Sequence, residues 1–160
     1  MNHAKNSISN CSAFDVAAYI LDKLGEMSAW KLQKLVYYSQ VWSLVWDGKR
    51  LFDQKIEAWI NGPVCRELYE IHKGRFEIND IDCGDKNALN ETQKESVDAV
   101  LKYYGDKSPQ WLADLTHLEN PWRLARESLN PNERGNIEIS LESMAEYYES
   151  LTKEENMPID

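Results

Sequence analysis

The chain has 160 residues, the length of one ordinary globular domain, and its 42% hydrophobic and 28% charged residues are typical of a folded protein. Its net charge of −9 opposes contact with phosphate backbones, so nucleic acid is not an expected partner. No apolar run approaches the roughly 20 residues that a membrane-spanning helix requires, which predicts a cytoplasmic protein without membrane contact.

Two helices are predicted near the start of the chain. Ser12 and Asp15 have the spacing of a capping box, apolar residues then recur at intervals of three and four, and Gly25 is placed to end the helix. Ser28 can cap a second helix, which continues until Gly48. Apolar and aromatic residues occupy more than one side of this second helix, so we expect it to lie centrally.

The middle of the chain predicts one strand and one helix. Residues 49–60 include an alternating stretch that indicates a short strand, and Asn61-Gly62-Pro63 is a turn sequence. Because proline suits the first turn of a helix, a helix is predicted from Pro63 until Gly74 ends it. Residues 75–90 are rich in Asp and Asn, which predicts an irregular surface connection.

Four further helices are predicted in the second half, each from a capping signal. These signals are Asn90 with Gln93, Ser108-Pro109, Asn120-Pro121 and Ser140. Ile137-Glu138-Ile139 is a second strand candidate, and the tail from Lys153 onward is expected to fray. The predicted fold is mainly α, with about seven helices in a single compact domain over residues 1–160. Its core is expected at about residues 12–152, between frayed termini. One short two-stranded β-ribbon is also possible.

Familiar catalytic motifs are missing from the sequence, which has no nucleotide-binding glycine loop, zinc-protease helix motif or hydrolase elbow. Cys65, His72 and His117 are residue types that a nucleophile–base pair or a metal site would use. Cys65 and His72 share only a helix face, so a buried thiol and a helix-end imidazole are the plainer interpretation. We therefore expect no catalytic residue, cofactor or metal. With Cys11 and Cys83, the cysteines number three without a C-x-x-C spacing, which predicts reduced thiols.

Basic and aromatic residues are interleaved along the second predicted helix. The cluster consists of Trp30, Lys31, Lys34, Tyr37, Tyr38 and Trp42. A protein partner suits such a patch better than a nucleic acid does, because Tyr, Trp and Arg dominate the hot spots of protein interfaces. The alternative that most of these rings belong to the core stays open.

An ordered series of motifs resembles one known family. In chain order the motifs are Gly25-Glu26-Met27, residues 31–38 (KLQKLVYY), Glu57-Ala58-Trp59, Asn61-Gly62-Pro63-Val64, Leu68-Tyr69, residues 108–112 (SPQWL), Leu115-Thr116-His117, Asn120-Pro121-Trp122 and Ala125-Arg126. The series, from about Phe14 to Leu151, is similar to the Panacea domain of SocA-like antitoxins. The resemblance extends over nearly the whole chain.

This resemblance implies a bacterial or prophage-encoded antitoxin, of the toxin–antitoxin and phage-defence class, that neutralises a cognate toxin encoded beside it. Direct protein–protein binding is the expected mode. Delivery of the toxin to a cytoplasmic ATP-dependent protease and enzymatic reversal of the toxin's modification are the alternatives, and a homodimer is left open. The expected partner-binding groove contains Lys31, Lys34, Tyr38, Trp42, Arg123 and Arg126.

Overall fold

The computed structural model describes residues 11–155, which contain seven helices and five short strands. In chain order the elements are α2 (Ala13–Leu24), β1 (Met27–Ser28), α3 (Ala29–Asp47), β2 (Ile56–Trp59), β3 (Gly62–Cys65), α4 (Arg66–His72), β4 (Glu77–Ile78), α5 (Glu91–Tyr104), α6 (Pro109–Leu118), α7 (Asn120–Ala125), β5 (Ile137–Glu138) and α8 (Leu141–Glu155). The expected mainly helical fold with about seven helices is confirmed.

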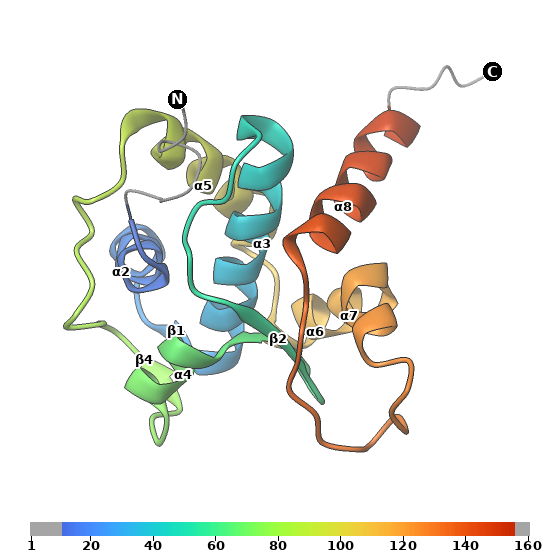
Figure 1. Ribbon diagram of the computed structural model, residues 1–160. Coiled ribbons are helices and arrows are strands. Elements are labelled where there is room, and N and C mark those ends of the chain that lie inside the picture. Colours follow the sequence, from blue (N-terminus) through green and yellow to red (C-terminus); the bar gives the residue numbers. More distant parts are fainter. Residues whose placement is uncertain (1–10, 156–160) are drawn as a thin grey trace.

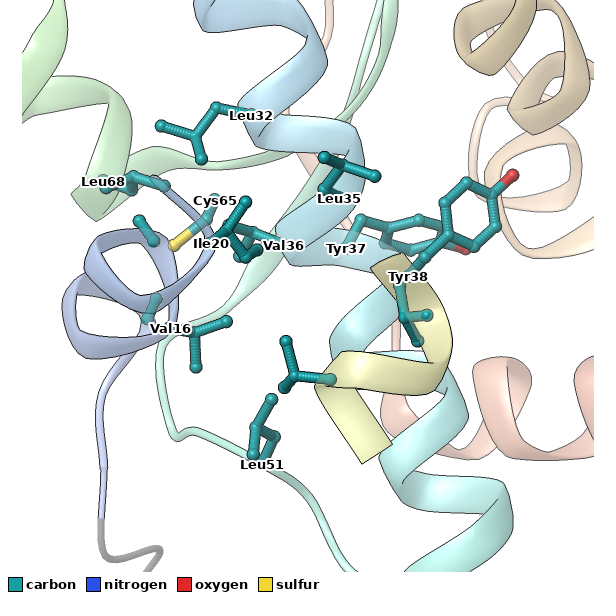
Figure 2. Close-up of a cluster of buried hydrophobic side chains, with 14 of the residues drawn as sticks. Val16, Ile20, Leu32, Leu35, Val36, Tyr37, Tyr38, Leu51, Cys65 and Leu68 are labelled. Atoms are coloured by element: carbon teal, nitrogen blue, oxygen red, sulfur yellow. The ribbon is translucent and has the colours of Figure 1, made fainter. Parts of the chain in front are cut away.

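Helix α3 lies at the centre of the fold and packs against α2, α5, α6 and α8 (Figure 1). Every residue from Leu32 to Val41 is buried, so this part of the helix is enclosed on all sides. Its apolar residues join those of α2 and the chain after α3 in one core cluster, which includes Cys65 (Figure 2). The central position predicted for this helix is confirmed.

The predicted helix starts are mostly confirmed, because each depends on a few adjacent residues. Ser12 and Asp15 form the capping box of α2, and the Ser28 hydroxyl accepts from the Lys31 backbone N–H at the start of α3. Asn120 is one exception. It lies inside α7, whose N-cap is Glu119, and no side chain caps that helix.

The strands form two antiparallel sheets, which is more than the one short two-stranded ribbon that the sequence left open. One sheet has the order β3-β2-β5, and the other pairs β1 with β4. The helix predicted from Pro63 was also wrong over its first turn, because residues 62–65 form β3 and α4 begins at Arg66. Proline is tolerated in β3 because this strand is at the edge of its sheet, where a missing N–H breaks no ladder.

The segment 75–90, predicted to be irregular, contributes to the core. Ile78 pairs with Met27 across β4 and β1 and is fully buried, and Ile81 and Leu89 are also buried. At the other end, α8 continues to Glu155, past the point where fraying was expected. The remaining terminal residues lie outside the part of the chain that the structure describes. Among residues 11–155, no helix is long and apolar enough to cross a membrane.

Candidate functional site

A cavity of about 280 Å³ lies between the start of α3, the hairpin of β2 and β3, and α4. Side chains that line it include Trp30, Gln33, Lys34, Trp59, Tyr69 and His72. Helix α3 supplies three of these, strand β2 one and helix α4 two. We refer to it as the Lys34 cavity, because Lys34 is the charged residue among those that line it.

Lys34 is buried without a counter-ion. Its exposed fraction is 2%, and it forms no ion pair with any carboxylate of residues 11–155. Its Nζ lies 5.9 Å from the centre of the Trp30 ring, a cation–π contact. Burial lowers the pKa of Lys34 to about 8, so the ammonium form still predominates at pH 7. A charged group in this position costs folding free energy unless a ligand compensates it.

Gly62 provides the space that the Lys34 side chain occupies. A Cβ at Gly62 would lie 2.5 Å from Lys34 Cε and 3.0 Å from Nζ, which is too close for a carbon atom. The φ angle of Gly62 is +131°, in the region that favours glycine. The motif predicted as a turn therefore also lets the lysine approach the hairpin backbone. The turn itself falls at Ile60 and Asn61.

Gln33 fixes the hydrogen bonding of the cavity's histidine. Its Oε1 accepts from the backbone N–H of Cys65 at 2.9 Å, and its Nε2 donates to the Cys65 carbonyl at 3.2 Å, so the amide orientation is determined. The remaining Nε2 hydrogen points to His72 Nε2 at 3.0 Å, which must accept it. His72 is consequently neutral and carries its proton on Nδ1, a buried atom with no partner among the described residues. Burial also lowers the pKa of His72.

Helix α7 and the residue that follows it bond to the hairpin of β2 and β3. Trp122 Nε1 donates to the Trp59 carbonyl at 2.7 Å, and the Trp122 ring stacks on His117 with centroids 4.1 Å apart. Arg126 donates through Nη1 to the Ala58 carbonyl at 3.0 Å and through Nη2 to the Glu133 carbonyl. These contacts keep the hairpin, and with it the Lys34 cavity, in place.

Large apolar side chains lie exposed on, or just after, the helices that line the Lys34 cavity. Trp30 lines the cavity and is 44% exposed, and Ile71 on α4 is 45% exposed. Phe76, just after α4, is 73% exposed and shares a second, more open hollow of about 560 Å³ with Trp30. We call Trp30, Ile71 and Phe76 the apolar rim. Exposed apolar groups gathered at a cavity are typical of a protein-binding surface.

A second polar cluster is enclosed between α3, α7 and α8. Glu119 Oε1 accepts from the hydroxyls of Tyr38 at 2.8 Å and Tyr148 at 2.6 Å, and the Tyr37 hydroxyl lies 3.1 Å from that of Tyr148. Burial raises the pKa of Glu119 to about 7, although both hydrogen bonds oppose the change. This network is internal and stabilises the packing of the three helices.

The six residues predicted to bind a partner have different surroundings. Lys34, Tyr38 and Arg126 are buried, Lys31 and Trp42 are half-buried, and Arg123 is exposed. Trp42 donates to the Tyr104 hydroxyl at 3.0 Å and stacks on Trp46. Of the six, Lys34 is the residue that lines the Lys34 cavity, whereas Tyr38 and Arg126 bond to groups of the same chain. A role in partner contact stays a prediction for all six.

The three residues of the enzymatic alternative have contacts within the fold. Cys65 is buried in the core cluster, and burial raises the pKa of its thiol to about 11. His72 is hydrogen-bonded to Gln33, which also bonds to the Cys65 backbone. His117 stacks on Trp122. Within residues 11–155, no three His, Cys, Asp or Glu side chains are grouped so that they could hold a metal ion.

The family described as Antitoxin SocA-like, Panacea domain, matches residues 32–123, more than half of the chain. The chain belongs to this family. The Panacea match begins in α3 and ends in α7, so it includes Lys34, Gly62, His72 and Phe76 but not α2 or α8. No curated protein and no solved structure matches this Panacea chain.

Sequence reasoning did not find the rim residues Ile71 and Phe76 or the part played by Gln33. Ile71 lies within the helix predicted to end at Gly74, and nothing in the sequence marked it as exposed. Phe76 lies in the segment that was predicted to be an irregular connection. The available signal was Lys34 itself, a charged residue that directly precedes the apolar and aromatic residues 35–38.

Proposed function

We propose that this Panacea-family protein is an antitoxin that neutralises a toxin encoded beside it by direct protein–protein binding. Family membership supports the antitoxin role. The observation that carries the binding mode is the apolar rim beside a cavity with an uncompensated buried cation. Both features are unfavourable in an isolated protein and become favourable when a partner covers them.

The contact surface that we propose is centred on Trp30, Ile71 and Phe76. Trp30 and Phe76 line one open hollow, and Ile71 is exposed on α4, the helix that carries the cavity residues Tyr69 and His72. Of the residues predicted from the sequence, Lys31, Lys34 and Arg123 stay proposed contacts. Tyr38 and Arg126, which are buried, and Trp42, which bonds to Tyr104, would act by holding α3 and the β2–β3 hairpin in position.

The test places the neighbouring gene under inducible control and scores growth with and without this protein. Direct neutralisation predicts rescue of growth and a stoichiometric complex on a sizing column. Rescue that is lost in cells lacking a cytoplasmic ATP-dependent protease would instead favour the adaptor mode. Rescue at substoichiometric amounts without a complex would favour enzymatic reversal.

Surface variants locate the contact. Ile71→Ser combined with Phe76→Ser removes two exposed apolar side chains and should abolish both rescue and co-elution. Trp46→Ser is the matched control, because Trp46 is 48% exposed and lies at the opposite end of α3 from the rim. Equal loss in both variants, or no loss in the rim variant, would show that the contact lies elsewhere.

A further inference from the structure

We propose that the Lys34 cavity binds the carboxylate of an aspartate or glutamate side chain that the toxin inserts into it. This inference rests on the proposed antitoxin function and names the chemistry of the contact. The carboxylate would accept from the Lys34 ammonium, and its methylene groups would lie against the aromatic wall of the cavity.

The first support is the state of Lys34 in the free protein. Lys34 is 2% exposed. Among the described residues, its ammonium makes a cation–π contact with the Trp30 ring, whose centre lies 5.9 Å from Nζ. A cation–π contact replaces only part of the hydration that an ammonium loses on burial. An incoming carboxylate would replace more of it through a charge-assisted hydrogen bond.

The second support is the charge and shape of the cavity wall. Lys34 is its single cation, and His72 is kept neutral by the hydrogen bond that it accepts from Gln33. One positive charge is matched by a monoanion, whereas a phosphate dianion would leave a buried negative charge uncompensated. The cavity volume of about 280 Å³ accommodates a side chain rather than a single water molecule.

The third support concerns the source of the carboxylate. The cavity opens beside Trp30 and the strongly exposed Phe76, which a free small acid would leave in water. A polypeptide that inserts an acidic side chain can cover both rings with its flanking residues. At long range the net charge of −9 repels an acidic partner. Recognition at Lys34 must therefore act at short range, with one acidic residue on a partner that is otherwise neutral or basic.

The experiment compares toxin binding by the wild type, Lys34→Met and Lys49→Met with isothermal titration calorimetry at pH 7. Lys34→Met keeps a side chain of similar length and leaves the inserted carboxylate buried without a cation, so the Kd should weaken by a factor on the order of 100. Lys49→Met removes the same charge from an exposed site just after α3, at the end away from Trp30, and should change the Kd less than about threefold. Circular dichroism checks that both variants fold.

Amide substitutions in the toxin then identify the carboxylate. Replacing each Asp by Asn and each Glu by Gln should reveal one substitution that weakens binding to the wild type but strengthens binding to Lys34→Met, because it removes the carboxylate left without a cation. If Lys34→Met fails to fold, an NMR titration of the Lys34 Cε resonance in the lysine-labelled wild type serves as the test instead. Its titration midpoint should rise when toxin is added, because a bound carboxylate favours the ammonium form.

Each outcome separates the inference from the proposed function. A wild-type complex whose Kd is unchanged by Lys34→Met, or that couples to no toxin carboxylate, overturns the carboxylate site and leaves direct neutralisation intact. An unmoved Lys34 resonance in the complex has the same meaning. Failure of the wild type to bind any toxin overturns both.

Discussion

Replacing Lys34 by methionine should make the free protein more stable at neutral pH. Burial lowers the pKa of this lysine from 10.5 to about 8. Each pKa unit corresponds to about 1.4 kcal/mol, so the buried ammonium costs about 3 kcal/mol of folding free energy. Methionine removes this cost but also the cation–π contact with Trp30, which is worth about 1 kcal/mol. The expected net gain for Lys34→Met is about 2 kcal/mol at pH 7.

The pH dependence gives this prediction its sign. Below about pH 8 the lysine is protonated in both the folded and the unfolded chain, and its cost is fully present. Between about pH 8 and pH 10.5 the unfolded chain binds more protons than the folded one, so the stability of the wild type rises with pH. The advantage of Lys34→Met should therefore shrink over this window.

Urea denaturation at pH 7 and pH 10, followed by tryptophan fluorescence, measures the effect. The other titrating groups are common to both proteins, so the difference between their unfolding free energies isolates Lys34. Lys31→Met is the control and should change stability by less than about 0.5 kcal/mol. A Lys34→Met protein that is less stable than the wild type at pH 7, with the same dependence on urea, would refute the claim that this cation is uncompensated.

Three further predictions concern the residues that hold the site together. Burial raises the pKa of Glu119 from 4.5 to about 7, so the stability of the wild type should fall by up to about 3 kcal/mol as pH rises through this window. Glu119→Gln keeps an acceptor for the two tyrosine hydroxyls. In urea titrations from pH 5 to pH 8 its stability should therefore depend less on pH than that of the wild type. Gly62→Ala should lower the unfolding free energy by about 3 kcal/mol in the same assay, because its Cβ would meet the Lys34 side chain at a positive φ. Gly25→Ala is the control, with φ +86° and open space around it, and should lower the unfolding free energy by about 1 kcal/mol. Equal losses would argue against the close approach of Lys34 to Gly62. Arg126→Ala removes the donors to two backbone carbonyls and should lower the thermal midpoint by at least about 5 °C, and a shift as small as that of the exposed Arg123→Ala would contradict its role.

The helices and their ends could be predicted from the sequence because their signals are local. The capping box of Ser12 and Asp15, the N-cap Ser28 and the proline that follows Ser108 each act through backbone groups within three residues. The strands could not be predicted in the same way. A two-residue strand such as β4 has no alternation of its own and exists because Ile78 meets Met27 from a distant part of the chain.

The candidate site divides in the same way between sequence and tertiary structure. The sequence by itself determined that aromatic and basic residues cluster on α3 and that a glycine–proline pair follows β2. Only the tertiary structure decided that Lys34 lies inside the protein, that Gly62 makes space for it, and that Phe76 is exposed nearby. The physical reason is that helix caps depend on neighbours in the chain, whereas burial, charge compensation and cavity shape depend on which distant segments pack together.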